Sequence, residues 1–474
     1  MVFSSSLFLF FFLPAFLLGY LLVPKYFKNS WILLASLGFY YWGAPLFIYI
    51  LVGATIVDFF LINGIYQSKT PTRKKLFLIT SLSLNLGLLA YFKYANFFVE
   101  NFNSALNSIG VSEVSWTNIA LPIGISFYTF ETLTYAIDVY RGVHAPLKRI
   151  HHYLLYIVCF PKLIAGPIVR FNYIADQIPH RNETIDNRIF GFYRFSIGLA
   201  KKVLIANTLG GFATVILGAS INQLDTPTAW LGILAYTFQI YFDFSGYSDM
   251  AIGIGKIIGF SFPENFDNPY NSRSITEFWR RWHMTLGDWM KNYLYIPLGG
   301  NQVSSKSRLY SNLILVFLLS GLWHGASWNF IIWGAFHGTF LILDRMFLKR
   351  VLDAVGTIPS VLFTFLVVMI GWVFFSIEEF NGALNFIKLL FSFDGKLKFP
   401  MVSFEFYLTI IIATIISFVG LTNVGKKIQS FIYKEFEYSL TQTFLVLITG
   451  VILYGLSASY ITASGFNPFI YFRF

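Results

Sequence analysis

The stretch Leu309–Leu343 reads LYSNLILVFLLSGLWHGASWNFIIWGAFHGTFLIL and contains no Asp, Glu, Lys or Arg. A helix that crosses the hydrocarbon core of a bilayer needs about 20 mostly apolar residues. Two apolar segments, Leu309–Trp323 and Asn329–Leu343, flank a short group of small residues and one histidine. The stretch therefore predicts helices embedded in a membrane, and it decides the fold class that we expect for the chain.

The composition of the whole chain agrees with this interpretation. Hydrophobic residues make up 56% of the 474 residues and charged residues 12%, whereas soluble domains carry about 25% charged residues. The net charge of +11 points to cytoplasmic loops and anionic membrane lipids as contacts, and not to nucleic acid. We expect an all-α integral membrane protein that forms one polytopic domain over residues 1–474.

Further apolar runs occur along the chain, and several are too short to cross a bilayer alone. We expect the short ones to be re-entrant or broken helices surrounded by protein. The uncharged N-terminal run lacks the basic region and small-residue cleavage site of a signal peptide, so it is expected to be a retained span. The candidate spans before Leu309 are Leu7–Val23, Trp31–Trp42, Pro45–Ile65, Leu76–Phe92, Ile119–Ala136, Tyr153–Ile164, Phe190–Ala206, Ala213–Ile221 and Ala229–Phe242, and those after Leu343 are Pro359–Phe375, Phe406–Leu421 and Phe444–Tyr460.

Basic loops predict the orientation of the chain. The loops Lys69–Lys75 and Arg141–Arg149 are rich in Lys and Arg, whereas Lys93–Trp116 has one Lys and two Glu. Basic loops remain on the cytoplasmic side of bacterial and other membranes. We therefore expect a multi-pass protein of the cytoplasmic (inner) membrane with its N-terminus outside.

His324 is the sharpest chemical signal, because it lies near the middle of the charge-free stretch. An ionisable group at bilayer depth is costly and indicates function by default. Gly321, Gly325 and Ala326 are small enough to let a helix break or a substrate approach, and a histidine suits general-base work near neutral pH. The alternative is a histidine that only forms a hydrogen bond to a neighbouring helix.

The other histidines carry weaker signals. His337 follows His324 by thirteen residues, about 220° around one continuous helix, so we expect it on another face and in a structural role. His283 lies in EFWRRWHMTLGDWMKNYLYIPLGG (Glu277–Gly300), within the polar and aromatic stretch Ser261–Ser307. That mixture is typical of an amphipathic helix at the cytoplasmic face or packed into the protein. A metal site formed by these histidines is disfavoured, because no short spacing such as HExxH is present.

Two carboxylates closely follow the apolar run Ala229–Phe242. Asp243 and Asp249 lie in YFDFSGYSDMAIG, and we expect them to pair with Arg280 or Arg281. Orientation of a histidine is the alternative role for these carboxylates.

The segment CFPKLIAGPIVR (Cys159–Arg170) contains proline and glycine residues that are expected to break a helix. We expect Lys162 to extend toward the membrane interface, with lining a cavity as the alternative. Cys159 is the single cysteine, so an intramolecular disulfide and a cysteine-built metal site are excluded. Motifs of soluble enzymes, such as G-x-S-x-G, the P-loop or G-x-G-x-x-G after a strand, are missing from the sequence.

Four strings occur in order between residues 121 and 338. They are LPIGISFYTFETLTYAIDVYRG (Leu121–Gly142), FPKLIAGPIVRF (Phe160–Phe171), YFDFSGYSDMAIGIGKIIGFSFPENFDNPYNSRSITEFWRRWHMTLGDWMKNYLYIPLGG (Tyr241–Gly300) and GLWHGASWNFIIWGAFHG (Gly321–Gly338). Together they resemble the membrane-bound O-acyltransferase family, in its bacterial branch that includes alginate O-acetylation and, more distantly, teichoic-acid D-alanylation proteins. The resemblance implies that His324 is catalytic, that His283 is functionally important, and that a ring of helices surrounds a central funnel or tunnel. Glu131 departs from the family pattern, where we expect an uncharged residue.

The resemblance implies transfer of an acyl group, with acetyl favoured, from a cytoplasmic thioester donor to a hydroxyl acceptor at the outer face, which serves O-acetylation of an exported or cell-envelope polysaccharide. His324 is expected to act as the base, and His283 to position the donor or stabilise the oxyanion. The resemblance implies acetyl coenzyme A or an acylated carrier protein as donor, a secreted or membrane-anchored acetyltransferase as partner, and no bound cofactor or metal. The alternatives are D-alanyl transfer to teichoic acid and a transporter whose histidines relay protons. Further candidates for lining the donor route are Trp323, Arg280, Arg281, Asp243 and Asp249.

Overall fold

The computed structural model describes residues 2–392, 403–433 and 439–464, and the regular elements of these residues are all helices. Seven helical segments among them are long and apolar enough to cross a membrane. The predicted all-α membrane protein is therefore confirmed. The chain divides into two compact units, one formed by Met1–Gly191 with Ala251–Pro263 and the other by Phe192–Met250 with Glu264–Phe474.

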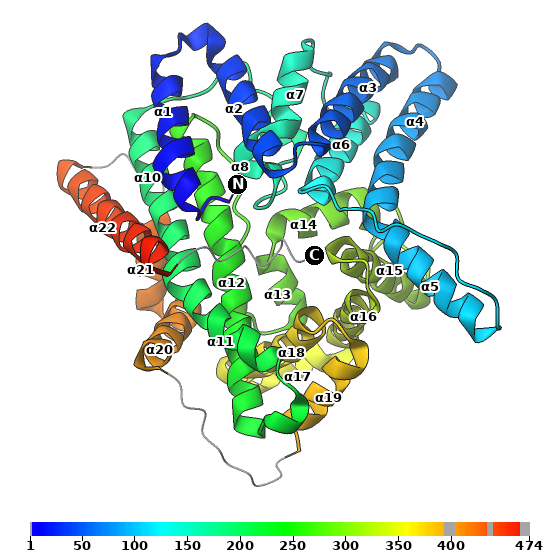
Figure 1. The fold of residues 1–474 in the computed structure, drawn as a ribbon, viewed down its shortest axis with the longest axis vertical. Helices are drawn as coiled ribbons and strands as arrows, with labels where there is room; N and C mark the ends of the chain where they lie inside the picture. The colour runs from blue at the N-terminus through cyan, green and yellow to red at the C-terminus, as the bar shows by residue number, and fades with distance from the viewer. Residues whose placement is uncertain (1, 393–402, 434–438, 465–474) are drawn as a thin grey trace. The chain divides into compact units, whose positions relative to one another are not determined.

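The first unit contains nine complete helices of the described chain. Among them, α3 packs against α4, α6 and α7, and α2 packs against α1 and α7. Figure 1 shows α3 and α4 side by side, with α5 continuing beyond α4. The helices are α1 (Leu13–Leu22), α2 (Lys28–Gly43), α3 (Phe47–Gln67), α4 (Pro71–Leu89), α5 (Ala95–Ser108), α6 (Ile125–Tyr140), α7 (Ile150–Val158), α8 (Phe160–Leu163) and α9 (Phe171–Ile174).

A buried carboxylate joins three helices of the first unit. Asp58 on α3 accepts hydrogen bonds from Ser81 and from Asn85 on α4 (Nδ2 to Oδ1, 3.3 Å), and from the Tyr153 hydroxyl on α7 (2.8 Å). Buried polar groups are stable when their partners are also in place. This network therefore holds α3, α4 and α7 together.

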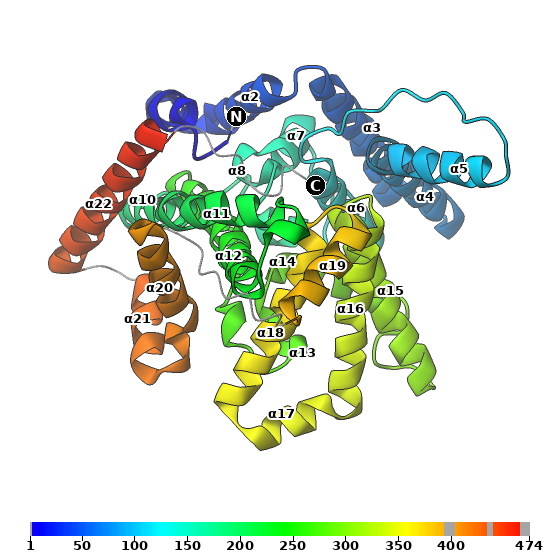
Figure 2. The same ribbon diagram turned by 60° about the horizontal axis from the view of Figure 1, so that its bottom comes forward.

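The second unit begins inside α10 (Ile185–Ala200) and includes most of α12 (Thr226–Ile257). Its core is aromatic, with Trp282, Trp333 and Trp372 fully buried. Figure 2 shows α17 connecting the ends of α16 and α18, which also pack against each other. The remaining helices are α11 (Asn207–Leu217), α13 (Ile275–Arg281), α14 (Met284–Trp289), α15 (Lys306–His324), α16 (Trp328–Leu343), α17 (Lys349–Val355), α18 (Thr357–Ser376), α19 (Phe380–Leu390), α20 (Phe404–Phe418), α21 (Asn423–Tyr433) and α22 (Leu440–Ser464).

Three of the apolar runs belong to helices that are longer than the runs themselves. Phe190–Ala206 and Ala213–Ile221 overlap one continuous helical segment, Ile185–Leu217, and Ala229–Phe242 lies inside the 32-residue α12. These helices continue past their apolar residues because the polar residues that follow are paired inside the protein, as described below. By contrast, Tyr153–Ile164 is broken as predicted, since α7 ends at Val158 and α8 covers only four residues.

Candidate active site

His324 is the last residue of α15, which forms a closely packed pair with α16. Ser305 begins α15, because its side-chain oxygen accepts a hydrogen bond from the backbone N–H of Arg308 (3.2 Å). Gly325 follows in an extended conformation and ends the helix. A Cβ atom at Gly321 would lie 2.1 Å from the carbonyl oxygen of Phe330, so only glycine permits this close approach of the two helices.

Three histidines of the second unit lie in one continuous set of aromatic contacts, which we call the histidine–tryptophan cluster. The Trp323 ring lies between His283 (ring centroids 5.9 Å apart) and His324 (5.0 Å). The Trp333 ring then lies between His324 (5.1 Å) and His337 (5.1 Å). The cluster consists of His283, His324, His337, Trp279, Trp323 and Trp333.

The expectation that His324 and His337 lie on different faces assumed one continuous helix, and that assumption is wrong. The break at Gly325–Ser327 places His324 on α15 and His337 on α16. The two helices run back along each other, so both imidazoles contact the ring of Trp333. Both ring nitrogens of His337 lack a hydrogen-bond partner among the described residues, and Gly371 of α18 lies directly against its Nε2.

His283 lies between two short helices, α13 and α14, and its backbone has a positive φ of 45°. The stretch Ser261–Ser307 is thus packed into the protein, and is not one amphipathic helix. Asn265 faces the imidazole, with its Oδ1 3.0 Å from His283 Nδ1. Burial lowers the pKa of His283 to about 3, so the imidazole is neutral at physiological pH.

Asp243 and Asp249 do not pair with Arg280 or Arg281, so that prediction was wrong. Asp249 accepts hydrogen bonds from Arg194 (Nη2 to Oδ1, 2.7 Å) and from Lys201 (Nζ to Oδ2, 2.7 Å). Asp243 forms an ion pair with Lys202 (2.7 Å). The partners are cations of the helical segment Ile185–Leu217, which packs against α12 through Gly198 and Gly246.

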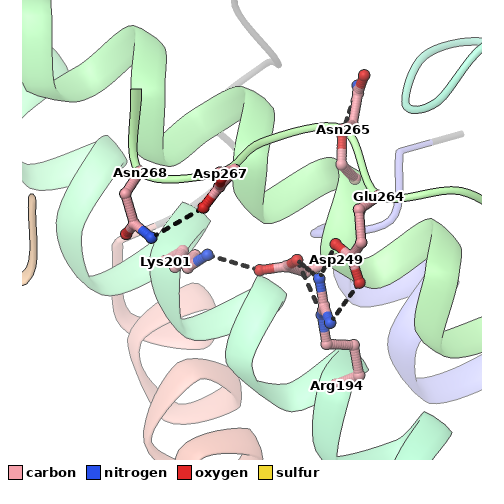
Figure 3. Close-up of polar contacts among 8 residues, drawn as sticks. Arg194, Lys201, Asp249, Glu264, Asn265, Asp267 and Asn268 are labelled. Carbon is pink, nitrogen blue, oxygen red and sulfur yellow. Dashed lines mark hydrogen bonds and ion pairs between the residues drawn. The ribbon is translucent and has the colours of Figure 1, made fainter. Parts of the chain in front are cut away.

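Arg194 is the centre of a wider ionic group, shown in Figure 3. Its guanidinium group also donates to both carboxylate oxygens of Glu264, at 3.0 and 2.6 Å, and lies 4.5 Å from the ring centroid of Tyr433 on α21. We call Arg194, Lys201, Asp249 and Glu264 the arginine–carboxylate cluster. Because each charge in this cluster is paired with an opposite charge, we interpret the cluster as a structural element.

The two arginines beside His283 occupy different environments. Arg280 is exposed. Arg281 is partly buried and forms an ion pair with Glu277 (2.8 Å) and a longer one with Asp267 (3.5 Å). Arg280 is thus available to a ligand, whereas Arg281 holds the segment around His283. Trp323 was also a candidate for lining the donor route, and its ring is buried between those of His283 and His324.

In the first unit, Lys162 does not extend to an interface, which corrects the prediction. Its side chain is fully buried and forms an ion pair with Glu131, which is also fully buried. The Lys162 ammonium lies 4.6 Å from the ring centroid of Tyr156. The negative charge of Glu131, which departs from the family pattern, is therefore balanced by the positive charge of Lys162. Cys159 is buried.

The described residues contain no group of three or more His, Cys, Asp or Glu side chains arranged to hold a metal ion. The imidazoles of the histidine–tryptophan cluster are separated by tryptophan rings, not gathered around one point. The imidazoles of His283, His324 and His337 are buried, and an imidazole is a side chain that can take a proton from a bound hydroxyl and return it.

The model of the membrane-bound O-acyltransferase family matches residues 147–377. A protein named probable alginate O-acetylase AlgI from Azotobacter vinelandii is 41% identical to this chain over the whole of both proteins. The chain belongs to the membrane-bound O-acyltransferase family. It is therefore a membrane O-acyltransferase, and the resemblance predicted from its motifs is confirmed.

Two other relatives show the breadth of the family. The peptidoglycan O-acetyltransferase of Helicobacter pylori is 38% identical over 83% of this chain and 80% of its own length. The teichoic acid D-alanyltransferase of Streptococcus thermophilus is 32% identical over 48% of this chain and 58% of its own length. Similarity to the acetylating members thus extends over more of the chain than similarity to the D-alanylating one.

Sequence reasoning missed the cations that pair with Asp243 and Asp249, although a signal was present. Arg194, Lys201 and Lys202 lie within an apolar run, and charges in such runs generally pair with one another. Asn265 was also missed. It precedes His283 by eighteen residues, and no spacing rule connects the two residues.

Proposed function

We propose that this O-acyltransferase transfers an acetyl group from a thioester donor at the cytoplasmic face to a hydroxyl acceptor at the outer face, and that this transfer serves O-acetylation of an exported or cell-envelope polysaccharide. Full-length similarity to a probable alginate O-acetylase, together with similarity to a peptidoglycan O-acetyltransferase, supports acetyl as the acyl group. The basic loops Lys69–Lys75 and Arg141–Arg149 support a cytoplasmic donor side and an outer N-terminus. A secreted or membrane-anchored acetyltransferase would pass the group to the final polysaccharide.

In this proposal the imidazole of His324 removes the proton from the acceptor hydroxyl while the hydroxyl oxygen attacks the thioester carbonyl carbon. The carbon–sulfur bond then breaks, and the protonated imidazole returns its proton to the departing thiolate. The products are an ester and a free thiol, and His324 returns to its neutral state. His283, on the other side of the Trp323 ring, positions the donor.

The observation that carries the proposal is the position of His324. It is buried at the end of α15, inside a stretch of 35 residues without a charged side chain. The imidazole of a histidine can take up a proton and release it near neutral pH, which supports the role of general base for His324.

The test compares two buried histidines that contact the same tryptophan. His324→Gln should lower acyl transfer by roughly 10²–10⁴-fold, the usual contribution of a general base. His337→Gln is the matched control, and its activity should stay within about tenfold of the wild type. The measurement is alkali-released acetate from the polysaccharide fraction of cells that express each variant at equal, folded levels.

Two results would overturn the proposal. Near-normal acetate release by the His324→Gln variant would remove the proposed base. Release of D-alanine in place of acetate from the same fraction would assign the chain to the D-alanylating members of the family.

A further inference from the structure

Asn265 makes a set of contacts that fixes which of its side-chain atoms is the oxygen. Its Oδ1 accepts hydrogen bonds from the backbone N–H of Thr285 (3.3 Å) and from the Thr285 hydroxyl (2.8 Å). Its Nδ2 donates to the Ser248 hydroxyl on α12 (3.1 Å). A backbone N–H can only donate. The atom that faces it must therefore be the oxygen of the amide and not its nitrogen.

This assignment decides where the proton of His283 lies. The same Oδ1 is 3.0 Å from His283 Nδ1, and an amide oxygen can only accept. His283 Nδ1 must therefore carry the hydrogen. A neutral imidazole has a single N–H, so Nε2 carries a lone pair. Nε2 is buried and has no hydrogen-bond partner among the described residues.

We infer that Asn265 is a positioning residue that holds His283 in its Nδ1–H form, so that Nε2 accepts a hydrogen bond from an N–H or O–H group of a bound substrate. The inference rests on the proposed acyl transfer and refines the part that His283 plays in it. An oxyanion needs a donor, and Nε2 has no hydrogen to donate in this form. His283 therefore positions a substrate as an acceptor and does not stabilise the oxyanion.

Neighbouring contacts keep Asn265 in place. Its backbone carbonyl accepts from the N–H of Met284 (2.9 Å), and the N–H of Asp267 donates to the carbonyl of Arg281 (3.0 Å). The preceding residue, Glu264, is held by Arg194, as Figure 3 shows. The loop and the residues around His283 are thus joined at several points, and the imidazole is oriented before substrate binds.

Among the described residues, Asn265 supplies the hydrogen bond to the His283 ring. The rings in contact with it are those of Phe244 on α12 (4.6 Å) and Trp323 on α15 (5.9 Å), neither of which titrates. Burial alone accounts for the low pKa of His283, with no contribution from a charged side chain. The hydrogen bond to Asn265 is therefore the interaction that selects between the two neutral forms.

The first experiment observes this form directly, without substrate. The full-length protein is labelled with 15N in its histidine rings, and the His283 signals are identified by their loss in a His283→Gln variant. In the wild type and in Asn265→Asp, which keeps an acceptor oxygen, we expect a protonated Nδ1 and an unprotonated Nε2. In Asn265→Leu, which has a similar size and no acceptor, we expect the Nε2–H form to appear. A protonated Nε2 in the wild type would overturn the inference, and so would an unchanged spectrum in Asn265→Leu.

The second experiment separates positioning from a merely structural role through the pH profile of acetate transfer. Asn265→Leu should lower kcat/KM at every pH by about 10–100-fold, as does the loss of residues that orient metal-bound histidines. Asn265→Asp should be nearly as active as the wild type at pH 8, but it should lose activity toward pH 5, because the added carboxylate favours protonation of His283. Equal losses in both variants with no change in pH profile would show that Asn265 only maintains the fold.

These outcomes remain distinct from a failure of the proposed function. If His324→Gln were fully active, the proposed base would be wrong, whereas the 15N signals of His283 would still report the form that Asn265 selects. If Asn265→Leu did not fold, the spectrum of the wild type and the pH profile of Asn265→Asp would still decide the inference.

Discussion

The histidine–tryptophan cluster and the arginine–carboxylate cluster both lie in the second unit, but they differ in how many of their polar atoms have a hydrogen-bond partner. In the arginine–carboxylate cluster, Arg194 and Lys201 both reach Asp249, and Arg194 also binds Glu264 through two hydrogen bonds. In the histidine–tryptophan cluster, His283 Nε2 and both nitrogens of His337 have no partner among the described residues. The charged groups are thus fully engaged, and the neutral ones retain unused hydrogen-bonding capacity.

This difference has a physical basis. An unpaired charge inside a protein is so costly that charged groups persist there mainly as pairs or networks. A neutral imidazole without a partner loses only about 1–3 kcal/mol, so a fold can tolerate several of them where a substrate will supply the missing partner. In this chain, the paired charges therefore indicate how the helices are held together, and the histidine–tryptophan cluster is where we propose that a substrate binds, at His283 and His324.

The strongest test of this contrast is Asp249→Asn. The change leaves Lys201 without a carboxylate and Arg194 with Glu264 alone, so we expect the free energy of unfolding to fall by about 3–5 kcal/mol, the usual cost of removing one partner of a buried pair. Chemical denaturation in detergent measures the loss. The activity of the molecules that remain folded should stay close to that of the wild type.

Glu264→Gln is the matched control for Asp249→Asn. The Glu264 side chain is half exposed, so water can replace part of its interaction with Arg194, and the loss of stability should be smaller. If Asp249→Asn were stable but inactive, Asp249 would belong to the chemistry, and the contrast between the two clusters would fail.

The pair Glu131–Lys162 extends the test to the first unit. Both side chains are fully buried, so Glu131→Gln should cost about 3–5 kcal/mol by leaving the Lys162 ammonium unpaired. The double variant Glu131→Gln, Lys162→Gln removes both charges, and it should lose less stability than the sum of the two single variants. Thermal unfolding of the wild type, the two single variants and the double variant gives the interaction free energy between the two charges. Additive losses would show that the two charges do not stabilise each other.

The sequence predicted the structure well where the composition of one short segment was sufficient to decide the prediction. The charge-free run Leu309–Leu343 predicted embedded helices, and α15 and α16 occupy it. The same absence of charge singled out His324, and Pro161 in CFPKL predicted the break between α7 and α8. Each of these predictions depends on local hydropathy or local backbone chemistry, which a single sequence contains.

The sequence was a poor guide where two distant segments meet. The 220° estimate for His337 failed because the turn at Gly325–Ser327 reverses the chain, and a helical angle has no meaning across such a turn. The partners of Asp249 were assigned to the nearest arginines in the motif, whereas Arg194 lies 55 residues away. Asn265 carries no signal of its own, because a single asparagine in a loop has many ordinary uses.

The smallest expected effect concerns the exposed charge beside His283. Coenzyme A and phosphopantetheine carriers are anionic, so Arg280, which is exposed, would attract either donor electrostatically. In neutral lipid at low salt, Arg280→Gln should raise the KM for acetyl coenzyme A by about two- to fivefold and leave the acceptor KM unchanged. The effect should shrink at physiological salt, because exposed charges are screened beyond about 8 Å.

Arg281→Gln is the natural comparison, because the two residues are adjacent but only Arg281 is tied to Glu277 and Asp267. Its loss would loosen the segment that carries His283, so kcat should fall together with any change in KM. Neutral lipid matters in both experiments, since it removes the attraction between arginine and anionic lipid. A donor KM that does not change in Arg280→Gln at low salt would show that this arginine does not steer the donor. The exposed charge of Arg280 would then interact with anionic lipid at the membrane surface alone.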